Sequence, residues 1–146
     1  MIYLGTDHRG FALKEKIKTW LTEWGMEFID CGNLALDPVD DYPDFVAQVA
    51  AKVSEDPINN LGIVLGATGQ GEAMVANHRH MVRTAVIYQY NEEVIKLTRE
   101  HNASNILALG ASFISDDDAQ KTIKLWLDTP FSKEERHIRR IAKIDA

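Results

Sequence analysis

Short apolar runs alternate along the chain with longer segments in which apolar residues recur every three or four positions. The short runs predict β-strands, and the longer segments have the spacing of amphipathic helices. Strands are expected at residues 1–5, 27–31, 61–65, 84–88 and 105–109, and helices at residues 13–24, 45–53, 71–80, 92–100, 117–127 and 133–144. The run 61–65 contains no polar residue, which is typical of a strand covered on both faces.

This alternation predicts a single α/β domain over residues 1–146, with a five-stranded parallel sheet, helices on both of its faces and an extra helix at the C-terminus. In such folds, ligands bind beyond the carboxyl ends of the strands. The segments that follow the expected strands therefore carry the most weight for function. They are residues 6–10, 32–42, 66–72, 89–91 and 110–112.

Composition and charge narrow the class of protein. The net charge of -6 argues against general nucleic-acid binding and against a basic membrane-binding surface. No apolar run is long enough to span a bilayer, and the first ten residues read as a strand and a loop rather than as a signal peptide. The single cysteine, Cys31, excludes an internal disulfide and a multi-cysteine metal site. Together these features predict a cytoplasmic protein.

The glycine-rich segment after the third expected strand is the first candidate for binding chemistry. Its sequence, Gly-Ala-Thr-Gly-Gln-Gly-Glu over residues 66–72, combines three glycines with two small residues, so the backbone can approach a ligand closely. Because the segment leads into a helix, its N–H groups and the helix dipole favour a negative charge, either a phosphate or a developing enediolate oxygen. It matches neither the P-loop pattern nor GxGxxG, and a tight packing turn is the alternative interpretation.

Ionisable side chains near the expected strand ends are candidates for proton transfer. Glu72 lies in the first turn of the helix after the glycine segment. There it is either a general base with a pKa raised by partial burial or an acid that complements the helix dipole. Asp7 and His8 follow the first strand as an acid–base or hydroxyl-binding pair, unless Asp7 caps a helix that begins near Arg9. His101 precedes the fifth strand, and it is a candidate for proton transfer only if the fold brings it to the same pocket.

The last expected helix carries a local basic cluster. Arg136 and Arg140 are one helical turn apart on one face, an arrangement suited to holding a phosphate. A solvated, ion-paired terminal helix is the commoner case for such a pattern. His78 and His80 lie two residues apart near an expected helix end, and the sequence offers no evident third ligand for a metal there.

Taken in order, these motifs resemble the ribose-5-phosphate isomerase B family, which also contains the galactose-6-phosphate isomerase subunits. The resemblance rests on Asp7-His8-Arg9-Gly10, Asp41-Tyr42-Pro43, residues 66–72, Arg99-Glu100-His101-Asn102 and Arg136-His137-x-Arg139-Arg140, and it extends to Asp30-Cys31-Gly32 and residues 61–66. It implies a Rossmann-like three-layer α/β/α fold and an enediol mechanism without a metal or other cofactor. It also implies a homodimer or tetramer with sites at the subunit interface.

The resemblance further implies a role for each candidate residue. Glu72 would move a proton between C2 and C1 of the open-chain sugar, His101 would assist ring opening, and Asp7 would contact sugar hydroxyls or the ring oxygen. The Thr68 hydroxyl would lie near the reacting carbons, and Asn102 would bind near the same end. The phosphate would be held by His8, Arg136 and Arg140. Further substrate contacts are expected from Tyr42 and, around the enediolate oxygen, from Gly66, Ala67, Gly69, Gln70 and Gly71.

The chain departs from the usual family pattern at several places. Residues His78-Arg79-His80-Met81 stand where relatives often have a Lys-x-Pro-Gly turn, and three other departures fall on candidate site residues. Many members have a catalytic cysteine where this chain has Gly66. The chain therefore resembles the branch typified by actinobacterial enzymes, which uses a glutamate at the position of Glu72. The arginine that commonly follows the fifth strand is Ser112 here, and Arg9 replaces a common alanine. Arg9 either supplies the missing charge or is a surface residue.

These departures leave the preferred sugar open. The leading hypothesis is interconversion of ribose 5-phosphate and ribulose 5-phosphate. A tetrose phosphate, a hexose phosphate and an unphosphorylated aldose remain alternatives. Outside the enzymes, the alternative is a flavodoxin-like binding domain without chemistry.

Overall fold

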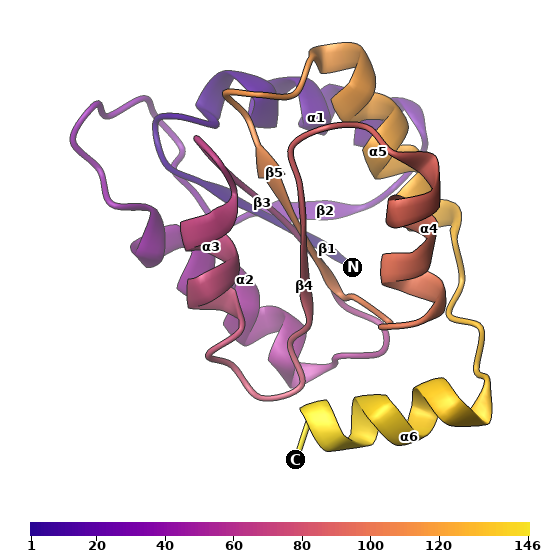
Figure 1. Cartoon of the computed structure of the whole chain (residues 1–146). Coiled ribbons are helices and arrows are strands. Elements are labelled where there is room, and N and C mark those ends of the chain that lie inside the picture. Colours follow the sequence, from indigo (N-terminus) through magenta and orange to yellow (C-terminus); the bar gives the residue numbers. More distant parts are fainter.

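The computed structural model describes residues 1–146, and its centre is a five-stranded parallel sheet with the strand order β2-β1-β3-β5-β4 (Figure 1). The strands are β1 (Ile2–Thr6), β2 (Phe28–Asp30), β3 (Leu61–Gly66), β4 (Thr84–Ile87) and β5 (Ile106–Gly110). The helices are α1 (Phe11–Glu23), α2 (Tyr42–Glu55), α3 (Gln70–Ala76), α4 (Glu92–Glu100), α5 (Asp116–Asp128) and α6 (Glu135–Ile144). The predicted three-layer α/β/α fold is confirmed.

Helices cover both faces of the sheet because its strands alternate their side chains between two cores. Along β3, Ile63 and Leu65 belong to the core that α1, α4 and α5 complete, whereas Val64 belongs to the core under α2 and α3. The central strands are therefore apolar at every position, and their ends, not their middles, are where polar groups collect.

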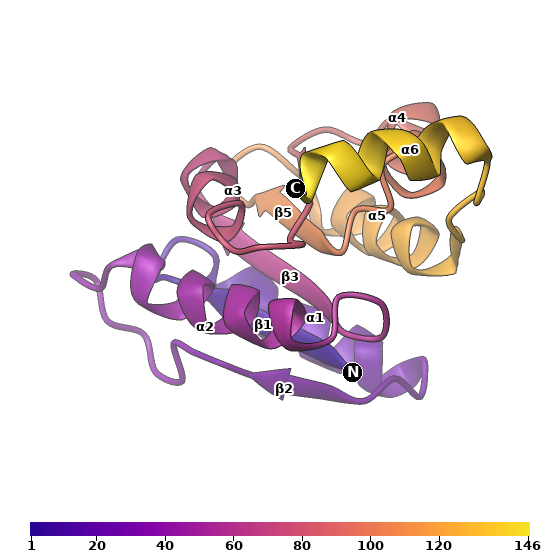
Figure 2. The same ribbon diagram turned by 90° about the horizontal axis from the view of Figure 1, so that it is seen from below.

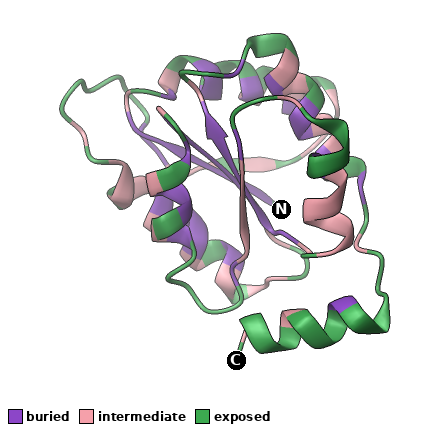
Figure 3. Cartoon of the chain, viewed as in Figure 1, coloured by how far each residue is buried: buried purple, intermediate pink, exposed green.

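Helix α6 stands apart from both layers. It lies beyond the amino ends of the strands, opposite the edge at which β1, β3 and β5 end (Figures 1 and 2). Figure 3 shows that α6 is almost wholly exposed, and His137 is its one buried residue. Its C-terminal end is fastened by Arg83, whose Nη1 bonds both carboxylate oxygens of Asp145 at 2.8 and 2.9 Å.

Some element ends differ from the sequence-based prediction. The helix expected over residues 71–80 ends at Ala76, because Asn77 caps it and the Asn77 side chain accepts the Thr84 N–H at 2.9 Å, turning the chain into β4. The last helix begins at Glu135 rather than at residue 133, since Lys133 has a left-handed φ of 57° that a helix does not accommodate. None of the helices has the length and apolar character needed to cross a membrane.

Candidate active site

The glycine loop that follows β3 forms a cradle of free backbone N–H groups. Gly69, the residue before α3, has a φ of 77°, a left-handed conformation that glycine adopts without strain. It also packs against the β5 backbone, where an added Cβ would lie 3.1 Å from the Leu109 carbonyl carbon. The N–H groups of Ala67, Thr68 and Gly69 donate no hydrogen bond within the chain. The loop is therefore built to donate to an anion at the start of a helix.

Glu72 points back from α3 into this cradle. Glu72 is only 4% exposed, and its carboxylate fills the space that a Cβ at Gly66 would need. Burial raises the pKa of Glu72, its own backbone N–H opposes that shift, and the negative charge of Asp7 adds to it. A buried carboxylate with a raised pKa beside a row of N–H donors has the properties of a general base next to an oxyanion site.

Replacing Gly66 with alanine should therefore move the Glu72 carboxylate rather than the backbone. A Cβ at residue 66 would overlap both Oε1 and Cδ of Glu72, which is the mobile end of a flexible side chain. Because a misplacement of about 1 Å can cost about 100-fold in rate, we expect kcat to fall about 100-fold with a small change in thermal stability. Kinetics and thermal unfolding of Gly66→Ala check this, and a fully active variant would contradict the fit.

Asp7 and His8 stand beside this loop at the end of β1. Asp7 is 6% exposed, and its Oδ1 accepts the Arg9 N–H at 2.9 Å. The interpretation of Asp7 as a helix cap near Arg9 is wrong, because α1 begins at Phe11 and Gly10 is its N-cap residue. The His8 backbone N–H donates to Asp40 Oδ1 at 2.9 Å, and the His8 ring Nδ1 lies 2.7 Å from the same oxygen. Arg9 is exposed, and its guanidinium makes no ion pair within the chain.

Three further predicted residues reach the same edge. Tyr42 begins α2, and its hydroxyl lies 2.6 Å from the position that a Cβ on Gly71 would occupy, so Tyr42 contacts the start of α3. Ser112 follows β5, and its N–H donates to the Ala67 carbonyl at 3.1 Å. Gln70 is exposed and donates its N–H to the Thr68 hydroxyl at 3.2 Å. The residues predicted after β1, β3 and β5 thus meet at one edge.

The other four predicted residues do not reach this edge within one chain. His101 and Asn102 follow α4 and precede β5, which places them at the amino edge of a parallel sheet. Arg136 and Arg140 lie on α6, beyond that same edge (Figure 1). Within a single chain, the fold therefore does not bring His101 to the glycine loop.

These four residues form a second group of their own. The His101 ring stacks on the His137 ring of α6, with centroids 4.1 Å apart and planes at 18°. Burial lowers the pKa of His137, and the neighbouring His101 lowers it further, which favours the neutral form of the ring. Arg136 pairs with Glu134 at 2.8 Å. A hollow of about 710 Å³ lies beside Asn102 and Arg83 at this edge.

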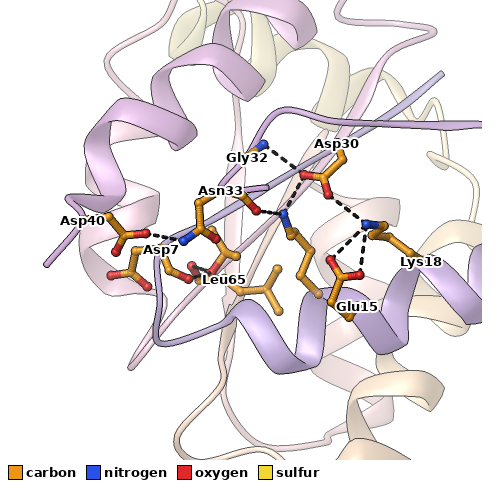
Figure 4. Close-up of polar contacts among 10 residues, drawn as sticks. Asp7, Glu15, Lys18, Asp30, Gly32, Asn33, Asp40 and Leu65 are labelled. Atoms are coloured by element: carbon orange, nitrogen blue, oxygen red, sulfur yellow. Dashed lines mark hydrogen bonds and ion pairs between the residues drawn. The ribbon is translucent and has the colours of Figure 1, made fainter. Parts of the chain in front are cut away.

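Sequence reasoning missed the polar network that supports His8. Lys14 is fully buried in α1, and its ammonium bonds Asp30 at 2.7 Å and also the Asn33 carbonyl oxygen (Figure 4). The Asn33 amide donates in turn to Asp40. The sequence could have indicated that Lys14 is buried, because its spacing places it on the same helix face as the buried Ile17 and Leu21. Asp40 gives no such signal within its acidic segment.

Asp7, His8 and Asp40 are also the chain's one group of three potential metal ligands, with ligand atoms within 4.8 Å of one another. The distance of 2.7 Å from His8 Nδ1 to Asp40 Oδ1 is that of a hydrogen bond, so this nitrogen already has Asp40 as its partner and is not a free metal ligand. His78 and His80 belong to no such group.

Comparison with known proteins assigns the family. The sequence model described as Ribose/Galactose Isomerase matches residues 2–144. The chain belongs to the ribose/galactose isomerase family. Ribose-5-phosphate isomerase B from Mycobacterium tuberculosis is 39% identical over 140 residues, which cover 96% of this chain and 85% of that protein. A probable ribose-5-phosphate isomerase B from Mycoplasma pneumoniae is 33% identical over 145 residues, covering 99% and 93% of the two chains.

Solved structures agree with this family assignment. Ribose-5-phosphate isomerase B from Mycoplasma genitalium, with bound ribulose-5-phosphate, superposes with a TM-score of 0.93 at 35% identity, covering 99% of this chain and 93% of that one. The Thermotoga maritima ribose 5-phosphate isomerase has a TM-score of 0.90 at 36% identity, covering 99% and 96%. The family prediction and the prediction of an isomerase enzyme are confirmed, because family model, relatives and fold all agree.

Proposed function

We propose that this chain interconverts ribose 5-phosphate and ribulose 5-phosphate through a cis-enediol, with Glu72 as the base. The observation that carries the proposal is the Glu72 carboxylate, buried in the space beside Gly66 and next to the free N–H groups of Ala67 to Gly69. The relative from Mycoplasma genitalium, which carries ribulose-5-phosphate, supports the choice of sugar.

The proposed proton transfer makes use of this geometry. Glu72 takes the proton from C2 of the open-chain aldose, and the electrons of that C–H bond form the C1–C2 double bond while O1 becomes an enediolate oxygen. The loop N–H groups stabilise the negative charge on O1. Transfer of the O2 proton to O1, beside the Thr68 hydroxyl, and return of the proton from Glu72 to C1 complete the ketose.

The remaining roles divide between the two edges of the sheet. Asp7 contacts the sugar hydroxyls or the ring oxygen, and Tyr42 borders the start of α3. His101 assists ring opening and Asn102 binds near the reacting end. His8, Arg136 and Arg140 hold the phosphate, for which guanidinium groups are well suited.

This division requires two copies of the chain. The groups holding Glu72 and His101 lie at opposite edges of one sheet, so one copy cannot bring them to a single sugar. A two-fold symmetric dimer pairs each edge with the opposite edge of its partner and builds two equal sites. The exposed α6 and the hollow beside Asn102 give the amino edge a surface for that contact.

Mixed dimers should test this arrangement directly. Glu72→Gln and His101→Asn chains, co-expressed with different tags and purified on both, would form dimers with one doubly altered site and one native site. We expect roughly half the wild-type activity per dimer, because one of two symmetric sites is intact. Each parent dimer should be nearly inactive. Mixed dimers as inactive as the parents would contradict a site shared between chains.

The basic test of function is isomerisation in deuterated water. Ribose 5-phosphate should give ribulose 5-phosphate, with deuterium entering at C1 of the product as the enediol is reprotonated. Four- and six-carbon aldose phosphates and unphosphorylated ribose should be assayed in parallel. The second candidate function is isomerisation of a different sugar, because the family arginine is absent at Ser112. If one of the other sugars is turned over faster than ribose 5-phosphate, that sugar is the preferred substrate. No exchange with any sugar would indicate a binding domain.

Arg9 is the residue best placed to replace the charge missing at Ser112. Both residues follow strands that flank β3, and the Arg9 guanidinium has no partner within the chain. Removing one charge-assisted contact to a phosphate typically costs about 1.5–3 kcal/mol, so Arg9→Ala should raise KM for ribose 5-phosphate about tenfold or more. Ser112→Arg in that background should recover part of the loss. An unchanged KM in Arg9→Ala would make Arg9 a surface residue.

A further inference from the structure

Asp40 holds His8 through two hydrogen bonds to one carboxylate oxygen. Asp40 Oδ1 lies 2.9 Å from the backbone nitrogen of His8 and 2.7 Å from its ring Nδ1. The Asp40 side chain is 6% exposed, against 28% for His8, so the carboxylate is covered while the ring retains an open side. The two residues are 32 positions apart in sequence, and the contact therefore depends on the fold.

The second oxygen of Asp40 is fixed from the core. Its partner is the side-chain amide of Asn33, a buried residue whose backbone N–H donates to the Thr6 carbonyl at 2.9 Å. The Asn33 carbonyl accepts from the buried Lys14 ammonium, which Asp30 neutralises (Figure 4). Residues 34–39 between Asn33 and Asp40 are exposed. Asp40 is thus anchored at the end of an exposed loop by contacts that begin in the core.

This arrangement determines which nitrogen of His8 carries the proton. An ionised carboxylate only accepts hydrogen bonds, so Nδ1 must be the donor to Asp40. The partner of one ring nitrogen sets the tautomer and the direction of the other. Nε2, on the other side of the ring, has no protein partner and is available to a ligand.

We infer that Asp40 is a positioning residue that fixes the tautomer and orientation of His8 for binding the phosphate end of the substrate. The inference rests on the proposed function, in which His8 contacts that phosphate. Asp40 acts through His8 and not on the sugar, so its effect should fall on KM rather than on kcat.

Position and charge can be separated with two variants. Asp40→Ala removes both contacts to His8. Asp40→Asn removes the charge but keeps an acceptor oxygen for His8, and its amide can donate to the Asn33 side-chain oxygen, which has no partner in the native chain. If position matters, Asp40→Ala should raise KM for ribose 5-phosphate about tenfold with kcat changed less than about threefold, and Asp40→Asn should stay near wild type. Asp37→Asn is the matched control, because the exposed Asp37 caps the same loop through an oxygen that asparagine retains.

A second measurement needs no substrate. The long-range ¹H–¹⁵N spectrum of the neutral His8 ring should show the proton on Nδ1 in the wild type and in Asp40→Asn, and loss of that preference in Asp40→Ala. A wild-type ring protonated on Nε2 would overturn the inference. So would an Asp40→Ala variant with unchanged KM, or an equal rise in KM in both variants, which would mean that only the charge matters. A wild-type protein that fails to isomerise ribose 5-phosphate contradicts the proposed function instead, and the tautomer measurement still decides the role of Asp40.

Discussion

Replacing Glu72 with glutamine should lower kcat for ribose 5-phosphate isomerisation about 1,000-fold, within the range of about 10² to 10⁴ typical for loss of a general base. Glutamine has nearly the same shape, so the space beside Gly66 stays filled and the glycine loop keeps its conformation. KM should change little, because the N–H cradle and the phosphate contacts remain. Steady-state kinetics measure both constants.

The same substitution should not destabilise the protein at neutral pH. Burial raises the pKa of Glu72 in the folded chain, so the folded state binds its proton more tightly than the unfolded state does. The stability that Glu72 contributes is therefore full below the ordinary glutamate pKa and is lost as pH rises through the raised value. Glu72→Gln should remove this dependence, which urea unfolding at acidic and neutral pH would detect.

Activity should follow the same titration in the opposite direction. Only ionised Glu72 can accept the C2 proton, so the acidic limb of kcat/KM should lie above the ordinary glutamate range. Glu93→Gln is the matched control, because Glu93 also lies in the first turn of a helix but is exposed. A near-native kcat in Glu72→Gln, or an unaltered acidic limb of its pH profile, would show that another residue transfers the proton.

Neutralising Asp30 should cost about 3 kcal/mol of unfolding free energy, since removing one partner of a buried ion pair leaves the other charge uncompensated. Lys14 is fully buried and its ammonium lies 2.7 Å from Asp30. Asp30→Asn keeps the acceptor for the Gly32 N–H, which bonds Asp30 at 3.0 Å, and so removes mainly the charge. Urea unfolding at neutral pH measures the loss.

Two comparisons separate charge from packing at this site. The double variant Lys14→Met/Asp30→Asn should recover much of the lost stability, because no unpaired ammonium remains buried. Asp128→Asn should have only a small effect, since Asp128 pairs with Lys124 on the exposed surface. Equal destabilisation by the single and double variants would show that the buried charge is not the cause.

The contribution of Asp30 should also appear in acid unfolding. Burial by itself would raise the pKa of Asp30, but hydrogen bonds from Lys14 and Gly32 and the ion pair with Lys18 together lower it. A lowered folded-state pKa means that this stability is present above the ordinary aspartate pKa and is lost as pH falls through the lowered value. Asp30→Asn should therefore lose less stability between neutral and acidic pH than the wild type.

Half of the candidate site could be predicted from strand ends alone. Asp7, Ala67 and Ser112 follow parallel strands, and the carboxyl ends of such strands meet at one edge, so their proximity needs only the alternation of elements. His101 could not be placed in this way. It precedes β5, at the sheet edge opposite Glu72, and only the proposed dimer would bring the two residues to one site.

Local pattern also fails where long-range contacts decide. Residues 77–80 contain no helix breaker, and the helix nevertheless ends at Ala76 because the Asn77 side chain bonds Thr84 at the start of β4. Asp40 is one acid in an acidic loop until the fold brings it to His8.

By itself, the sequence determined the α/β class, the parallel sheet, the glycine cradle after β3 and the family, because hydrophobic periodicity and motif order are local and ordered along the chain. Only the tertiary structure decided that the Glu72 carboxylate fills the space at Gly66, that a buried lysine supports the loop behind His8, and that the predicted residues divide between two edges. The physical reason is that burial, pKa and side-chain pairing arise from contacts between distant segments, which no spacing within one segment encodes.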